Sequence, residues 1–209
     1  MSDNRLKAIQ DILAGIEEPF ALSRGQICAL ATYYGMVLKW NSRLHLTTIT
    51  EPLEFVGRHI LEALEAVPLI PSSVDSIWDM GTGLGVPGIP LAIVLDEKEV
   101  KLVESSLKKT IFLEEVVRDL RLDNVEVVRH RIEDLEPLPG NSLLTARAVE
   151  SMADLLPDLL RIGDACPRIL LYGGRQLVEK TTDPAGRTAH LHPLAGSDNR
   201  FLIRLDRST

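Results

Sequence analysis

The fold of this chain is decided by the segment Ile77-Trp78-Asp79-Met80-Gly81-Thr82-Gly83-Leu84-Gly85-Val86-Pro87-Gly88. A short apolar run ends in an acid, three alternating glycines follow, and an apolar helical pattern starts at Pro87. Glycine allows a tight turn and lets a ligand approach the backbone closely. A turn of this kind, between a buried strand and a helix, forms the first ligand-binding crevice of a doubly wound sheet.

Strand and helix patterns alternate after Pro71, on both sides of this segment. We expect strands at Ser76–Met80, Val100–Glu104, Val125–Arg129, Leu143–Ala148 and Arg168–Tyr172, and two further strands near Ala189–His192 and Phe201–Leu205. We expect helices near Pro87–Leu95, Leu107–Arg121 and Met152–Ile162. This alternation predicts an α/β fold of the Rossmann-like type, a doubly wound and mostly parallel seven-stranded sheet with helices on both faces.

The residues before Pro71 have helical patterns instead. A stripe from Leu6 to Ile16 predicts a first helix, and Ser23 with Gln26 forms the capping-box pattern that opens a second. A third helix is predicted from Pro52 to Val67. We therefore predict an N-terminal helical cap over residues 1–70 and an α/β core over residues 71–209, joined in one compact unit.

The composition is that of an ordinary globular protein, with 209 residues, 45% of them hydrophobic. The net charge of −7 argues against a uniformly positive, nucleic-acid-coating surface, although it permits a local basic face. No apolar run is long enough for a membrane span, and the first ten residues have no signal-peptide pattern. Cys28 and Cys166 are too few for a zinc knuckle, so we expect no metal site, two buried free thiols and a reducing, cytoplasmic location.

The acids around the glycine turn indicate which ligand binds there. Glu104 ends the predicted second strand, where a carboxylate accepts hydrogen bonds from both ribose hydroxyls. Asp79 would oppose a pyrophosphate but suits a cationic amino-acid group, either directly or through the loop backbone. We therefore favour S-adenosylmethionine. The literal G-x-G-x-x-G from Gly83 to Gly88 keeps a nicotinamide dinucleotide as an alternative, although Pro87 has no N–H to offer a phosphate. A purely structural glycine turn also stays open.

A charged segment after the third strand, Arg129-His130-Arg131-Ile132-Glu133-Asp134, borders the same crevice. Ile132 would pack on an adenine ring, and Glu133 with nearby amides would read its edge. The alternative is a solvated charged turn.

Several separate motifs then resemble one known family. The strongest runs from Asp79 to Pro90 and is similar to a "DVGTGxGLPGIP" signature. Further matches are Lys39-Trp40-Asn41 with Leu46-Thr47 ("WN…NLT"), Arg58-His59-Ile60-Leu61 ("RHI-L"), Glu104-Ser105 with Lys108-Lys109 ("DSxxKR"), Arg131-Ile132-Glu133 ("RxE") and Arg147-Ala148 ("SRA"). From Lys39 to Leu205 the chain resembles the bacterial 16S ribosomal RNA guanine-N7 methyltransferases, also called glucose-inhibited division protein B (RsmG/GidB).

The resemblance implies a class I methyltransferase fold, S-adenosylmethionine as the methyl donor, and 16S ribosomal RNA or the small ribosomal subunit as the partner, without DNA or membrane. We expect a monomer. Arg147 would lie between cofactor and substrate and is the one candidate catalytic residue. The implied cofactor-binding residues are Asp79, Gly81, Thr82, Gly83, Gly85, Val86, Glu104, Ile132, Glu133 and Arg147. The candidate RNA-binding residues are Arg58, His59, Lys108, Lys109 and Arg131.

The chain departs from the family pattern at three positions, where His45, Ala146 and Tyr172 replace an asparagine, a serine and a lysine. These departures lie toward the RNA side and motivate a second alternative, a methyltransferase-like module that binds RNA without turnover.

Chemistry at guanine N7 needs no general base, because the nitrogen carries an exposed lone pair; we therefore expect catalysis by orientation. RNA binding would need a local positive rim, for which the candidates are Lys39, Arg43, Arg58, His59, Lys108, Lys109, Arg129, Arg131 and Arg147.

Overall fold

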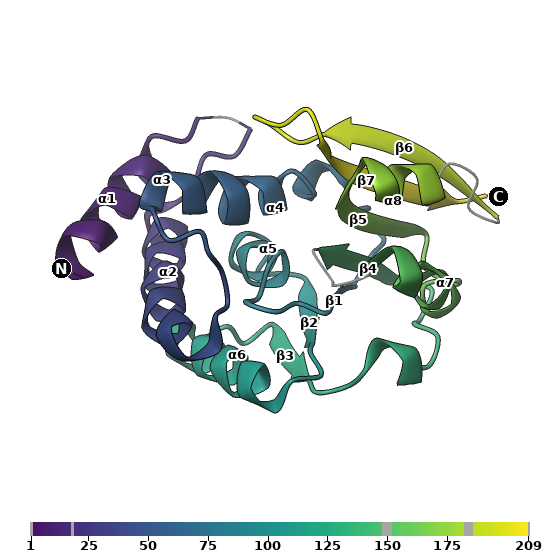
Figure 1. Cartoon of the computed structure of the whole chain (residues 1–209), viewed down its shortest axis with the longest axis horizontal. Helices are drawn as coiled ribbons and strands as arrows, with labels where there is room; N and C mark the ends of the chain where they lie inside the picture. The colour runs from purple at the N-terminus through teal and green to yellow at the C-terminus, as the bar shows by residue number, and fades with distance from the viewer. Residues whose placement is uncertain (1, 18, 148–151, 182–185, 209) are drawn as a thin grey trace.

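The computed structural model describes residues 2–17, 19–147, 152–181 and 186–208. These residues form a seven-stranded sheet in the order β3-β2-β1-β4-β5-β7-β6 (Figure 1). The strands are β1 (Ser76–Met80), β2 (Glu99–Val103), β3 (Val125–Val128), β4 (Ser142–Arg147), β5 (Arg168–Gly174), β6 (Arg187–Pro193) and β7 (Arg200–Arg207). The first five are parallel to one another, and β7 runs antiparallel to β5 and β6. The predicted sheet is confirmed.

The chain order reverses between β1 and β4. From β1 the chain winds outward to β2 and β3, then returns to place β4 on the other side of β1. Ligands of open α/β sheets bind at such a switch point, outside the carboxyl ends of the strands. The glycine turn after β1 lies at this point.

Helices cover both faces of the sheet. They are α1 (Ser2–Ala14), α2 (Arg24–Leu44), α3 (Pro52–Phe55), α4 (Glu62–Leu64), α5 (Gly88–Val94), α6 (Leu107–Leu120), α7 (Met152–Ile162) and α8 (Arg175–Lys180). Shorter turns are the π-helical η1 (Val56–Leu61) and the 3₁₀ turns η2 (Val67–Leu69) and η3 (Ile132–Asp134). The short helix α8 has no counterpart in the sequence prediction.

Two hydrophobic clusters hold these layers together. Strand side chains alternate between faces, so Leu143 packs with the α1–α6 side while Leu144 packs with α7 on the other. The same alternation separates Leu170 from Leu171 on β5. Both faces are apolar because a central parallel strand is covered twice.

The N-terminal helices belong to the larger of these clusters. Ser23 and Gln26 form the expected reciprocal cap of α2, and α2 then packs against α5 and α6. Apolar side chains from both sides of residue 70 therefore share one core. The division into a cap and a core stays a prediction.

The predicted helix over residues 52–67 is continuous to Leu64, but its middle turn widens into the π-helical η1. Such widened turns are rare and often occur at functional sites. Arg58 and His59 both lie on η1.

Cys28 is exposed on α2, so the expectation that it is buried was wrong, whereas Cys166 is buried as expected. Cys28 lies on the outward face of an amphipathic helix, where an apolar stretch of sequence does not guarantee burial. Ala148, the predicted last residue of the fourth strand, lies outside the described residues. Within the described ranges, every helix is too short or too polar to span a lipid bilayer.

Candidate functional site

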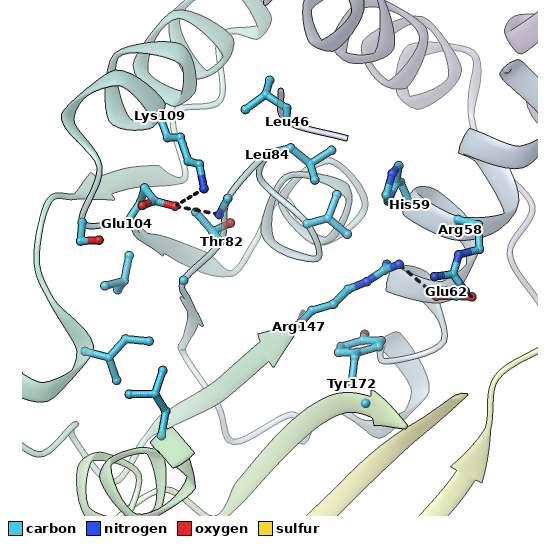
Figure 2. Close-up of a pocket in the computed structure, with 18 of the residues that line it drawn as sticks. Leu46, Arg58, His59, Glu62, Thr82, Leu84, Glu104, Lys109, Arg147 and Tyr172 are labelled. Atoms are coloured by element: carbon cyan, nitrogen blue, oxygen red, sulfur yellow. Dashed lines mark hydrogen bonds and ion pairs between the residues drawn. The ribbon is translucent and has the colours of Figure 1, made fainter. Parts of the chain in front are cut away.

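A cavity of about 750 Å³ opens at the carboxyl ends of the parallel strands. Figure 2 shows Glu104 and Lys109 on one side of it, and Arg58, Glu62, Arg147 and Tyr172 on the other. We call the two sides the loop end (residues 81–84, Glu104, Lys109 and Ile132) and the arginine end (Arg58, Glu62, Arg147, Tyr172 and Arg200). The volume lies in the usual range for a cofactor site.

The glycine turn forms the wall at the loop end. Gly81, Gly83 and Gly85 have φ angles of 64°, 61° and 100°. These positive angles are disfavoured for residues that have a Cβ atom. Gly88 is required for a different reason. A Cβ there would collide with the Leu102 side chain and lie 2.8 Å from Asp79 Oδ2, so glycine lets α5 pack against the sheet.

Asp79 lies beneath this turn and is fully buried. Its Oδ2 accepts hydrogen bonds from the Thr82 hydroxyl at 2.5 Å and the Gly88 N–H at 2.8 Å. Burial raises the pKa of the carboxyl to about 7, against the lowering effect of these two donors. Asp79 does not line the cavity, so of the two roles expected for it, the arrangement fits the one that acts through the loop backbone.

Glu104 occupies the position predicted for a ribose-binding acid, immediately after β2. One carboxylate oxygen accepts the Gly83 N–H at 3.1 Å and the other the Ser106 N–H at 2.8 Å. Lys109 Nζ lies 3.9 Å from Oε2. Each carboxylate oxygen has a second lone pair, so Glu104 can still accept two hydroxyl groups in the cavity.

The segment after β3 reaches the same end of the cavity. Ile132 is buried on η3 and lines it together with Arg131 and Glu133. Arg161 of α7 donates to the carbonyl groups of Glu133 and Leu135, which holds η3 in place. Ile132 therefore presents an apolar side chain to the cavity, and its packing on an adenine ring stays a prediction.

The N-terminal motif reaches the cavity through a chain of hydrogen bonds. The Asn41 side chain donates to the Thr47 carbonyl and accepts the Thr47 N–H. The Thr47 hydroxyl in turn contacts His59 Nε2 at 2.9 Å. Burial lowers the pKa of His59 to about 3, with Arg147 and Arg58 adding to the effect. His59 lines the cavity but is neutral near pH 7, so it adds no positive charge to the predicted rim there.

The arginine end is built around Glu62, whose side chain is only 3% exposed. Its carboxylate pairs with Arg58 at 3.2 Å, Arg147 at 3.0 Å and Arg200 at 2.8 Å. The Arg147 guanidinium also lies 5.9 Å from the centre of the Tyr172 ring, whose hydroxyl donates to a carbonyl of α4. Glu62 and Arg200 were not predicted from the sequence, because they lie 138 residues apart and carry no local signal.

The predicted rim is only partly assembled. Arg58, Lys109, Arg131 and Arg147 line the cavity, whereas Lys108 does not. Lys39 pairs with Glu115 instead, at 2.9 Å. The remaining predicted rim residues, Arg43 and Arg129, and the loop residue Gly85 are also outside the lining. Across the part of the chain that the structure describes, histidine, cysteine and acidic side chains form no group of three able to hold a metal.

The start of α5 is poorly suited to a pyrophosphate. The Gly88 N–H donates to Asp79, the Ile89 N–H donates to the Gly85 carbonyl, and Pro87 has no N–H. The donors that a dinucleotide site offers to phosphate are therefore engaged within the chain. This arrangement disfavours the nicotinamide alternative.

Comparison with known proteins also supports a methyltransferase. Residues 26–190 match the family model GidB, described as rRNA small subunit methyltransferase G. The chain is 38% identical over 205 residues to ribosomal RNA small subunit methyltransferase G of Ectopseudomonas mendocina, covering 95% of this chain and 96% of the relative. The corresponding protein of Pseudomonas syringae pv. syringae is 34% identical, with 95% of both chains covered.

Solved structures share the fold at low sequence identity. A putative S-adenosylmethionine-dependent methyltransferase from Methanococcus maripaludis aligns with a TM-score of 0.58 and 11% identity, over 93% of this chain and 98% of that one. The 23S rRNA methyltransferase ErmE aligns with a TM-score of 0.54 and 16% identity, over 71% of this chain and 67% of that one. These likenesses confirm the predicted class I methyltransferase fold. With the family model covering most of its length and relatives aligned almost end to end, the chain belongs to the GidB family, rRNA small subunit methyltransferase G.

Proposed function

We propose that this protein transfers the methyl group of S-adenosylmethionine to N7 of a guanine in small-subunit ribosomal RNA. The observation that carries the proposal is the position of Glu104, a buried carboxylate that faces a nucleoside-sized cavity beside the glycine turn. The family to which the chain belongs supports the reaction and the RNA class.

The residues of the loop end suit S-adenosylmethionine. Glu104 would accept the ribose hydroxyls, and Ile132 would pack on the adenine ring, with Glu133 near its edge. The backbone of residues 81–84 would lie along the nucleoside. Beneath the loop, the Asp79 carboxyl adds negative charge as it ionises, which suits a cationic sulfonium better than a phosphate.

When bound, S-adenosylmethionine supplies an electrophilic methyl group; the chain has to place guanine N7 in line with it. N7 lies on the major-groove edge of guanine as a free acceptor, so no proton has to be removed. Holding the two atoms at near-attack distance can contribute roughly 7–11 kcal/mol to lowering the barrier. Arg147, at the end of β4 in the arginine end of the cavity, would orient the base or an adjacent group.

His59 can contribute to the same step. The ring is neutral, Nε2 contacts Thr47, and Nδ1 has no hydrogen-bond partner among the described residues. One buried polar atom of the ring is therefore left unsatisfied beside the cavity. The chain of contacts from Asn41 would keep the ring in place.

The experiment uses small ribosomal subunits from cells that lack the gene, the purified protein and methyl-labelled S-adenosylmethionine. Label should enter the RNA, and borohydride–aniline scission should map it to N7-methylguanine. Binding of RNA without any label incorporation would instead support the non-catalytic alternative, which the Tyr172 departure motivates. Heat of binding with NAD(H) and none with S-adenosylmethionine would support the oxidoreductase alternative.

Glu104→Gln tests the cofactor assignment directly. Losing a charge-assisted hydrogen bond costs about 1.5–3 kcal/mol, so the Kd for S-adenosylmethionine should rise about 10- to 160-fold. Glu99→Gln is the matched control, since Glu99 is exposed at the other end of β2. Equal calorimetric Kd values for both variants would contradict the assignment.

We further propose that the protein acts as a cytoplasmic monomer on RNA rather than DNA. Analytical ultracentrifugation of the free protein would test the monomer, methyl transfer to rRNA compared with DNA of the same sequence would test the RNA preference, and cell fractionation would test the location.

A further inference from the structure

The arginine end of the cavity carries more positive than negative charge. Three guanidinium groups share the single carboxylate of Glu62. They come from η1, β4 and β7, so three segments distant in sequence bring their cations to one place. An excess of two positive charges remains at the cavity wall. The neutral His59 and Tyr172 line the same wall, and the Glu65 carboxylate lies outside the lining but close enough to act on Glu62 and Tyr172.

Among the three guanidinium groups, that of Arg147 is the most buried, and Glu62 satisfies its hydrogen-bond donors only in part. Its side chain is 10% exposed, and its Nη2 pairs with Glu62. Its Nη1 is buried without a hydrogen-bond partner among the described residues. A buried charged donor is normally satisfied, so this atom indicates a place at the cavity wall where a further acceptor can bind.

Arg58 and Arg200 extend the site toward solvent. Their side chains are 28% and 33% exposed, compared with 10% for Arg147. Planar guanidinium groups bind tetrahedral or planar oxyanions through paired hydrogen bonds. Glu62 braces all three, which orders them before a ligand arrives and reduces the entropy lost on binding.

We propose that Arg58, Arg147 and Arg200, held by Glu62, form an oxyanion site that receives a backbone phosphate of the substrate RNA next to the target guanine. This inference rests on the proposed function. It assigns a binding role to Glu62 and to Arg200, which lies on β7 beyond the residues matched by the family model. The partial exposure of Arg58 and Arg200 favours a strand that approaches from outside over a ligand enclosed in the cavity.

The same chemistry would accept a carboxylate, and S-adenosylmethionine carries one on its methionine moiety. The experiment therefore has two arms. The first measures filter binding of radiolabelled small-subunit rRNA over a range of salt concentrations. The second measures calorimetric binding of S-adenosylmethionine and of methylthioadenosine, which has the nucleoside and lacks the carboxylate.

Arg200→Gln is the test variant, and Arg207→Gln is its control. Arg207 is exposed on the same strand, seven residues and roughly 23 Å further along. Loss of one phosphate contact should lower the slope of log K against log salt by about 0.7–0.9. Arg200→Gln should show this change with an unaltered Kd for S-adenosylmethionine, and Arg207→Gln should match the unmodified protein in both arms. Arg200→Lys, which keeps the charge, should restore the slope.

Two results would overturn the proposal. One is an unchanged salt slope for Arg200→Gln. The other is weaker binding of S-adenosylmethionine, but not of methylthioadenosine, with RNA binding intact, which would make the methionine carboxylate the ligand. Methyl transfer by the unmodified protein is scored separately. If the unmodified protein transfers no methyl group but Arg200→Gln lowers the salt slope, the proposed function is refuted and the phosphate site stands. If the unmodified protein transfers methyl groups but Arg200→Gln leaves the salt slope unchanged, the phosphate site is refuted and the proposed function stands.

Discussion

Replacement of Asp79 by asparagine should change the pH dependence of folding in a defined direction. Both hydrogen bonds to the carboxyl reach Oδ2, from the Thr82 hydroxyl and the Gly88 N–H. An asparagine oxygen in the same place can accept both. Its amide nitrogen would then occupy the position of Oδ1, which has no partner among the described residues, much as a protonated carboxyl would. The substitution therefore removes the ionisation and little else.

The magnitude follows from the pKa of Asp79, which burial raises from 3.8 to about 7. Each pKa unit corresponds to about 1.4 kcal/mol, so ionisation in the folded state costs about 4 kcal/mol. The raised pKa means that the folded chain holds its proton more tightly than the unfolded chain. The stabilisation is complete below pH 3.8, is lost as the pH rises toward 7, and is absent above it.

The assay is urea unfolding of both proteins between pH 4 and pH 8. The two free energies of unfolding should agree within about 1 kcal/mol at pH 4, because the folded carboxyl is then neutral and the unfolded one is only partly ionised. By pH 8 Asp79→Asn should be the more stable protein by as much as about 4 kcal/mol. Taking the difference between the two proteins cancels the titration of the other groups they share.

The control is Asp75→Asn, at an exposed aspartate one residue before β1 that accepts a hydrogen bond from Asn141. Its difference from the unmodified protein should not grow between pH 4 and pH 8. A difference for Asp79→Asn that is flat with pH would refute the reasoning. So would greater stability of the unmodified protein at pH 8.

Three further predictions follow from single contacts. Gly88→Ala places a methyl group against Leu102 and should destabilise the fold by about 1–3 kcal/mol, which the urea midpoint would register; unchanged stability would contradict the packing argument. Tyr172→Phe removes the hydrogen bond to α4 and should lower stability by about 1 kcal/mol, with thermal unfolding as the measurement and no loss as the contrary result. Cys28 is exposed, while Cys166 is buried with a pKa raised to about 11; a thiol reagent should therefore label one cysteine in the native protein and two in denaturant, and two native labels would be inconsistent with the fold.

The sequence predicted much of the loop end because its signals are local. Asp79, the glycines and Glu104 each occupy a fixed place relative to a strand end, and parallel strands bring their carboxyl ends to one edge. Their geometry therefore follows once the strands are recognised. The same logic placed Ile132 after β3.

The charged residues were less predictable. The positions of individual basic residues suggested a positive rim despite the negative net charge, but Lys39 pairs with Glu115 and His59 is neutral. Whether a basic side chain faces a cavity or an acid on the next helix depends on packing between helices. The buried, neutral state of His59 likewise depends on its surroundings, which local sequence does not encode.

By itself, the sequence determined the doubly wound sheet, the glycine turn and the acids beside it, because strand alternation and glycine backbone freedom act over a few residues. Only the tertiary structure decided the arginine end. There η1, β4 and β7 converge, and Glu62 meets Arg200 across 138 positions of chain. A charge cluster of this kind forms only when the strands have paired in their final order and the helices have packed on the sheet. The ion pairs of Glu62 with Arg147 and Arg200 join segments that are distant in sequence, so their formation depends on the tertiary structure.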